Sequence, residues 1–157
     1  MADLREATRQ TVHLAVLDGT EVVYVEILRD NTAPRMPSSE PGGRLPAHDT
    51  AVGRVFLAFS GPDVVDDACS RALRPVGPRT ITAPELLRRE LDRIHGAGIG
   101  CAASPVLGTQ GTALAGISIS GWHGRLDLPR IGPAVRTAAL ALGRELRGVR
   151  RVELDSR

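Results

Sequence analysis

Two hairpin signals constrain the fold of this chain more than any other feature of its sequence. Residues 12–28 (VHLAVLDGTEVVYVEIL) contain two runs rich in β-branched residues, and the Asp-Gly pair at 18–19 supplies the positive φ angles that a tight turn needs. Two further apolar runs, 99–107 and 113–120, flank a short segment with a glycine at each end. The sequence therefore predicts two antiparallel hairpins, one early and one late in the chain.

Two short helices are predicted between the hairpins. Asp49 or Thr50 can cap the first, whose apolar residues recur at helical spacing until a glycine ends the pattern. Pro62 suits the first position of the second helix, and Cys69 falls on its apolar face, which indicates a core residue. The segment before them, 29–48, contains four prolines and two glycines without any periodicity, so we expect a connecting loop.

Two longer helices complete the pattern. Thr82 and Glu85 have the spacing of a capping box, and Ile81 and Leu86 have that of a hydrophobic staple, so a helix is expected to begin there. From about Pro129, apolar residues recur at alternating spacings of three and four, which is typical of a long amphipathic helix. The order hairpin, helices, hairpin, helix predicts an α+β fold, with an antiparallel sheet flanked by helices.

The composition fits one globular domain over residues 1–157 and argues against several classes of protein. The chain is 42% hydrophobic and 24% charged, which provides enough apolar surface for a core. Its net charge of +2 and its scattered arginines do not require a polyanionic partner. No apolar run is long enough for a membrane span, and the charged start lacks the apolar region of a signal peptide. Two cysteines without a C-x-x-C pair favour a reduced, cytoplasmic protein.

No cofactor or metal is expected from the sequence. The four histidines are isolated and do not pair with one another or with cysteines at the spacing of metal ligands. The sequence also contains no glycine-rich phosphate-binding motif and no nucleophile elbow, so nucleotide-binding and hydrolase functions lack support.

The strand predicted over 113–120 carries two serines. Period-two geometry places Ser118 and Ser120 on one face and the isoleucines of the strand on the other. One interpretation is an ordinary solvent-facing side, since serine is mostly exposed. The alternative is a row of hydroxyls that binds a ligand, which the apolar residues before the pair and the neighbouring Trp122 favour.

Two further features allow both a structural and a functional interpretation. The first N–H groups of a helix that starts at Ala51 lack intrahelical partners and attract a carboxylate, although every helix has such a terminus. Cys101 lies among small residues, where a thiol behaves as a small hydrophobe. A nucleophilic role for this cysteine needs an activating base, which spacing alone does not establish.

In their order along the chain, these segments resemble the effector-binding domain of IclR-type transcriptional regulators. The resemblance covers about Thr11 to Arg147 and rests mainly on LPAH with AVGRVFLA in 45–58 and on CAASPV with ISISG in 101–121. It implies a GAF-like α+β fold with an antiparallel sheet flanked by helices. It also implies that a small, often carboxylate-bearing effector lies between the short helix and the serine-bearing strand.

The resemblance further assigns residues to the effector site. The backbone amides at 51–52 and the two serine hydroxyls would converge on the carboxylate of the effector, close to the family's strand cysteine. Apolar side chains would surround the rest of the ligand, as in most small-molecule sites. The assigned residues are Ala51, Val52, Cys101, Ser118, Ser120, Leu45, Ile99 and Met36.

The sequence departs from the family pattern in two places. The winged helix-turn-helix that precedes the effector domain is not found, and residues 2–10 stand where the end of its linker helix would lie. DNA is therefore expected to bind only through a helix-turn-helix domain outside this sequence. The acidic segment that the family contributes to its pocket has no counterpart, because the chain runs directly from His95 to Cys101.

Three functions stay open at this point: a sensor of a small organic acid, an oligomerisation module with a vestigial pocket, and a GAF-like enzyme that uses Cys101. Self-association as a dimer or tetramer is expected in the first two. Residues 22–28 (VVYVEIL) would form a sheet edge rich in β-branched residues, and the resemblance implies a family that associates through its effector domains.

Overall fold

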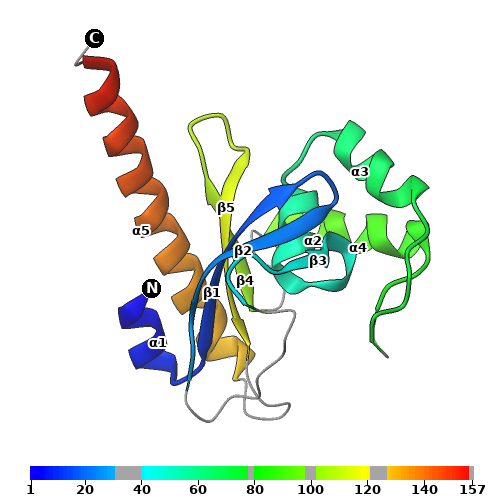
Figure 1. The fold of residues 1–157 in the computed structure, drawn as a ribbon, viewed down its shortest axis with the longest axis horizontal. Coiled ribbons are helices and arrows are strands. Elements are labelled where there is room, and N and C mark those ends of the chain that lie inside the picture. The colour runs from blue at the N-terminus through cyan, green and yellow to red at the C-terminus, as the bar shows by residue number, and fades with distance from the viewer. Residues whose placement is uncertain (31–39, 78–79, 98–101, 121–126, 156–157) are drawn as a thin grey trace.

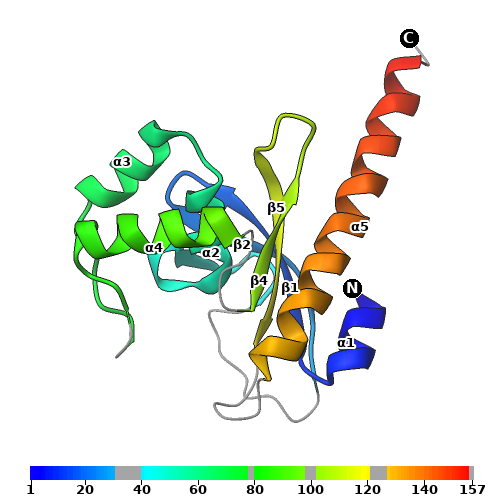
Figure 2. The same cartoon turned by 180° about the vertical axis from the view of Figure 1, so that it is seen from behind.

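The fold has three layers, with a sheet between two groups of helices (Figure 1). Helices α1 (Ala2–Thr8) and α5 (Leu128–Asp155) cover one face of the sheet, and the view from behind shows the other helices on the opposite face (Figure 2). The computed structural model describes residues 1–30, 40–77, 80–97, 102–120 and 127–155. The layered arrangement confirms the predicted α+β class.

Within the described residues the sheet has five strands, paired antiparallel in the order β3-β2-β1-β5-β4. Both predicted hairpins are confirmed. The first turns at Gly19 with a φ of 60° and the second at Gly111 with a φ of 77°, angles that glycine adopts without steric cost. The strands are β1 (Thr11–Asp18), β2 (Glu21–Leu28), β3 (Arg44–Pro46), β4 (Ala103–Leu107) and β5 (Ala113–Ser120).

Two expectations about the sheet are wrong. The segment 29–48 is not only a loop, because it contains β3 and the start of the 3-10 helix η1 (Ala47–Asp49). Strand β3 pairs with β2 over Glu21–Val23, so 22–28 does not form a free edge along its whole length. The outermost strands of the described sheet are β3 and β4. A three-residue strand that ends in proline is too short to show an alternating pattern, which is why the sequence did not reveal it.

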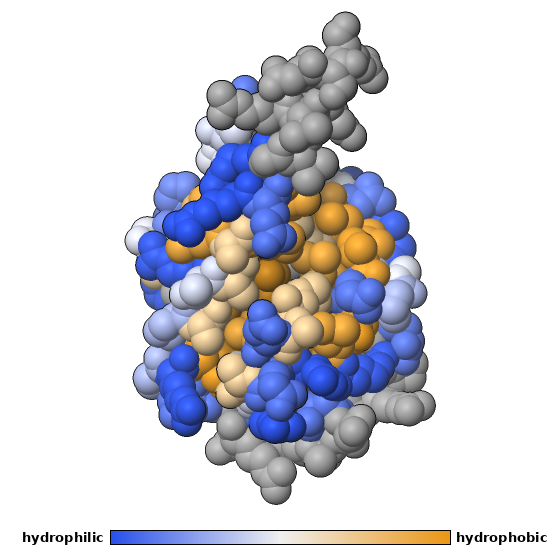
Figure 3. Space-filling view, turned by 90° about the vertical axis from the view of Figure 1, so that its left-hand side faces the viewer, coloured by the Kyte–Doolittle hydropathy of each residue, from blue (hydrophilic) through white to orange (hydrophobic). Residues whose placement is uncertain are grey.

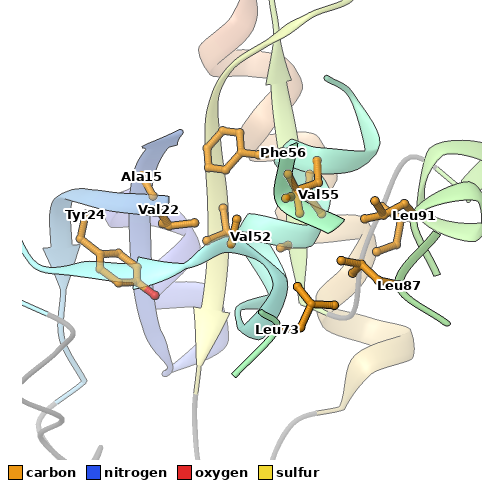
Figure 4. Close-up of a cluster of buried hydrophobic side chains, with 14 of the residues drawn as sticks. Ala15, Val22, Tyr24, Val52, Val55, Phe56, Leu73, Leu87 and Leu91 are labelled. Atoms are coloured by element: carbon orange, nitrogen blue, oxygen red, sulfur yellow. The ribbon is translucent and has the colours of Figure 1, made fainter. Parts of the chain in front are cut away.

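The helices α2 (Ala51–Ala58), α3 (Pro62–Ser70) and α4 (Pro84–Ala97) lie on the second face. Val52 and Phe56 project from α2 toward the sheet beside Ala15 and Val22 (Figure 4). Each apolar side chain of this size contributes about 1.5–3 kcal/mol when fully buried. The predicted core position of Cys69 is confirmed, since it is buried in the same cluster.

The start of α4 differs from the predicted capping box. Leu87 N donates to the carbonyl of Ala83 at 3.0 Å and the helix begins at Pro84, so the residue before the helix is Ala83 and not Thr82. Leu86 is 55% exposed and therefore does not form the expected staple. Proline is favoured at the first helical position, and here it sets the boundary.

The long amphipathic helix predicted from about Pro129 is confirmed as α5. It packs on β4 and β5, where its buried residues Ile131 and Val135 meet Ile117 and Ile119. None of the helices in the described part of the chain combines the length and the apolar character that crossing a membrane requires.

Candidate functional site

The serines of β5 lie on the face of the sheet that α2 covers. The isoleucines of the strand are buried on the opposite face, in the cluster with α1 and α5. Gly116 faces α2, since a Cβ atom there would stand 2.5 Å from Cγ2 of Val52. By the alternation of the strand, Ser118 and Ser120 share this face. Ser118 is only 7% exposed, whereas Ser120 at the end of the strand is exposed, so the Ser118 hydroxyl is not an ordinary surface group.

Helix α2 begins in close contact with the segment before it. Thr50 is the N-cap, and its Oγ1 accepts a hydrogen bond from the backbone N of Gly53 at 2.9 Å. A Cβ atom at Gly53 would stand 2.2 Å from the carbonyl oxygen of Ala47, so glycine allows η1 to approach the helix this closely. The helix itself provides no acceptor for the amides of Ala51 and Val52.

The helix start and the serine face meet at Gly116. Val52 is 1% exposed and packs directly over Gly116. Ser118 is two residues further along β5, which is about 7 Å in an extended strand. The first turn of α2 therefore lies over β5 about two residues from Ser118, on the same face of the sheet.

Strand β1 adds a histidine that the sequence alone does not assign to the site. His13 is directly opposite Ser118 in the register of β1 and β5, so their Cβ atoms are about 5 Å apart on one face. His13 is 5% exposed, and its ring centroid lies 5.3 Å from that of Tyr24 on β2, at an interplanar angle of 50°. The alternation of β1 places His13 on the same face as Ala15, but the register with β5 cannot be read from the sequence.

Burial sets the charge state of this pair. Desolvation lowers the pKa of His13 from 6.5 to about 4; a hydrogen bond to the Ser118 backbone partly opposes this, and the charge of Arg29 adds to the lowering. Burial and, to a smaller extent, the charge of Asp49 raise the pKa of Tyr24. Both side chains are therefore neutral at pH 7, and both offer hydrogen-bonding groups beside Ser118.

Hydrogen bonds to the chain after α3 hold the segment before α2 in place. The Asp49 carboxylate accepts a hydrogen bond from the Thr80 hydroxyl, whose oxygen accepts in turn from the backbone N of Gly77 at 2.8 Å. Nε2 of His48 lies 3.2 Å from the carbonyl oxygen of Arg74. These contacts fix the direction in which the first turn of α2 faces the sheet.

Leu45 lies in another part of the sheet. It is half-buried on β3, pairs with Val22, and packs against the apolar cluster around α2. Strands β2 and β1 separate β3 from β5, a distance of about 14 Å across the sheet. The structure therefore brings the start of α2 and Ser118 together but does not place Leu45 beside them.

The other assigned residues, Met36, Ile99 and Cys101, lie outside the described residues, as does Trp122. Across the ranges that the structure describes, no three histidine, cysteine, aspartate or glutamate side chains come close enough together to hold a metal ion.

Sequence comparisons match this chain to one family. The family described as bacterial transcriptional regulator IclR C-terminal matches residues 1–144. The HTH-type transcriptional regulator XynR of Escherichia coli K12 is 30% identical, over 93% of this chain and 64% of XynR. The HTH-type transcriptional regulator KdgR of the same strain is 33% identical, over 76% of this chain and 50% of KdgR. The chain thus spans less than two thirds of the length of these relatives.

Solved structures show the same similarity. An IclR homolog from Microbacterium hydrocarbonoxydans, complexed with 4-hydroxybenzoate, superposes with a TM-score of 0.82 at 31% identity, over 94% of this chain and 65% of the homolog. The C-terminal domain of E. coli KdgR gives a TM-score of 0.81 at 28% identity and covers 94% of this chain and 93% of that domain. The chain belongs to the IclR family and corresponds to the C-terminal, effector-binding domain of these transcriptional regulators.

Proposed function

We propose that this domain senses a small organic acid bound between α2 and β5. The observation that carries the proposal is the buried Ser118 hydroxyl, which lies on the face of the sheet that the first turn of α2 covers. A few converging polar groups within an apolar surface are the usual composition of a small-molecule site. The 4-hydroxybenzoate bound by the Microbacterium homolog supports aromatic carboxylates as the first compounds to test.

In this proposal the amides of Ala51 and Val52 and the hydroxyls of Ser118 and Ser120 bind the carboxylate. Amides at a helix N-terminus favour an anion, because their dipoles and unpaired N–H groups point toward it. The side chains proposed to surround the rest of the effector are Met36, Ile99 and Cys101, without Leu45, because two strands separate it from Ser118.

The proposed sensor acts without catalysis and through association of two copies. Binding of the effector biases the geometry in which the copies pair, and this changes operator binding by a helix-turn-helix domain that would belong to the same regulator. By itself, the chain 1–157 is proposed to form one domain that binds DNA only weakly and in a salt-dependent way.

A thermal-shift screen of carboxylates tests the proposal. It includes benzoate, 4-hydroxybenzoate and short aliphatic acids such as propionate, because a ligand that binds only the folded state raises the melting temperature. A screen without any shift would contradict the sensor function and favour an oligomerisation module. Turnover of a compound that is abolished by Cys101→Ala would instead favour an enzyme.

The double variant Ser118→Ala/Ser120→Ala tests the place of binding. We expect it to weaken binding of a carboxylate by about 1–3 kcal/mol, since a hydrogen bond to a charged group contributes that much. Calorimetric titration measures the affinity, and thermal unfolding without ligand checks that the fold is retained. Unchanged affinity in a folded double variant would show that β5 does not bind the carboxylate.

A further inference from the structure

The buried histidine on β1 points to a property of the site that the proposed function does not include. His13 lies directly across from Ser118, and both side chains are more than nine-tenths buried on the face that α2 covers. An anion bound by the Ser118 hydroxyl would therefore lie within a few ångströms of an imidazole. The imidazole is held among Tyr24, the β5 backbone and the apolar surface under α2.

Other charged groups around His13 are already engaged or oppose its protonation. Beyond the end of β2, Arg29 forms an ion pair with Glu40 at 2.6 Å, and its positive charge disfavours a second positive charge on His13. The charge of Asp49, before α2, adds to the raised pKa of Tyr24, and the Asp49 carboxylate accepts a hydrogen bond from the Thr80 hydroxyl.

The elements that pack on His13 contribute few charges of their own. The single charged residue of α2, Arg54, donates to the carbonyl of His48 at 3.2 Å. Strands β4 and β5 contain no ionisable side chain. Tyr24 on β2 is neutral at pH 7. Glu26 on β2 is opposite Leu14, on the other face of the sheet, and its Oε1 accepts from the backbone N of Ile27 at 2.9 Å. None of these groups places a negative charge on His13, so the charge that would stabilise its protonated form is one that the effector brings.

We propose that His13 is a ligand-contacting residue of the effector site and that its neutral imidazole takes up one proton when a carboxylate binds beside Ser118. This inference rests on the proposed function, because it needs the carboxylate to bind at that place. A buried carboxylate without a positive partner is costly, and an imidazolium at hydrogen-bonding distance removes much of that cost. The proton comes from solvent and returns to solvent when the effector leaves.

The sign of the pH dependence follows from linkage. The anion favours the charged imidazole, so the complex binds more protons than the free domain, and affinity rises as pH falls. Between pH 7.5 and 5.5 an ordinary carboxylic acid with a pKa of about 4 stays ionised, so the probe itself does not change charge. Uptake of one proton can change the affinity by at most about tenfold per pH unit. We expect benzoate to bind about tenfold more tightly at pH 5.5 than at pH 7.5.

Isothermal titration with benzoate, and in parallel with propionate, tests the inference. His13→Gln keeps a polar side chain of similar size that does not titrate, so its affinity should be independent of pH over this range. His95→Gln is the control: His95 is exposed at the end of α4 and contacts the Ala58 carbonyl rather than Ser118, so this variant should keep both the affinity and its pH dependence. Titration of the parent in two buffers with different ionisation enthalpies measures proton uptake without any substitution.

The outcomes separate the inference from the proposed function. Binding by the parent with neither proton uptake nor pH dependence overturns the role of His13 and leaves the effector site intact. An affinity that still depends on pH in a folded His13→Gln variant overturns the role of His13 as well. Absence of saturable binding of both probes contradicts the proposed function, and the inference with it.

Discussion

His13 makes the stability of the fold depend on pH. Its pKa is about 4 in the folded domain against 6.5 without burial, so the unfolded chain binds more protons between these values. Stability from this group is therefore complete above about pH 6.5 and is lost as pH falls toward 4. The full difference corresponds to about 3 kcal/mol, of which about 2 kcal/mol is lost between pH 7 and pH 5.

Urea unfolding at these two pH values measures this effect. Between pH 7 and pH 5, we expect the unfolding free energy of His13→Gln to fall by about 2 kcal/mol less than that of the parent. His95→Gln is the control, because His95 is exposed at the end of α4 and its Nδ1 donates to the Ala58 carbonyl oxygen at 2.7 Å. Equal losses in the parent and in His13→Gln would contradict the assignment of a buried, neutral imidazole.

At the scale of elements, the approach of η1 to α2 depends on one glycine. A Cβ atom at Gly53 would stand 2.2 Å from the Ala47 carbonyl oxygen and 2.6 Å from Oγ1 of Thr50, so both the turn and the N-cap must shift. We expect Gly53→Ala to destabilise the domain by about 1–3 kcal/mol, even though alanine is the better helix former. It should also weaken binding of a carboxylate, because the first turn of α2 moves.

The matched control for this variant is Gly96→Ala in α4. A Cβ atom at Gly96 meets nothing within 4 Å, so this substitution should stabilise the domain by up to about 1 kcal/mol through helix propensity. Thermal or urea unfolding of both variants gives the comparison. A stabilised Gly53→Ala would mean that η1 and α2 do not pack as closely as described.

The elements also show which features the sequence could predict. The hairpin turn at Gly19 and the apolar faces of α2 and α5 follow from signals within a few residues, and they were predicted correctly. The pairing of β1 with β5 joins segments about a hundred residues apart, and nothing local specifies which residue lies opposite Ser118. The sequence therefore singles out the two serines, but it does not place His13 opposite one of them.

At the scale of the whole molecule, one face is left partly uncovered. On the side that carries α1 and α5, apolar side chains gather in the middle of the surface and hydrophilic ones surround them (Figure 3). A cleft of about 550 Å³ opens there between the two helices and the sheet. Apolar side chains form most of its lining, including Leu4, Leu14, Ile117, Ala138 and Leu142. Contiguous apolar surface of this kind usually marks an interaction site.

We expect the domain to associate with a second copy through this face rather than through the edge of β2, which β3 partly covers. Ala141→Glu tests the face, because Ala141 is an exposed residue of the cleft and the new carboxylate would lie near Asp3 and Glu145. Like charges in an apolar interface are costly to bury, so this variant should be monomeric at concentrations where the parent is a dimer. Leu140→Glu is the control, since Leu140 is 48% exposed on α5 outside the lining of the cleft, and it should leave the mass unchanged.

Light scattering from micromolar to high micromolar concentration measures the mass of each protein with and without benzoate. A parent that stays monomeric in both conditions would remove the proposed route from effector binding to DNA geometry.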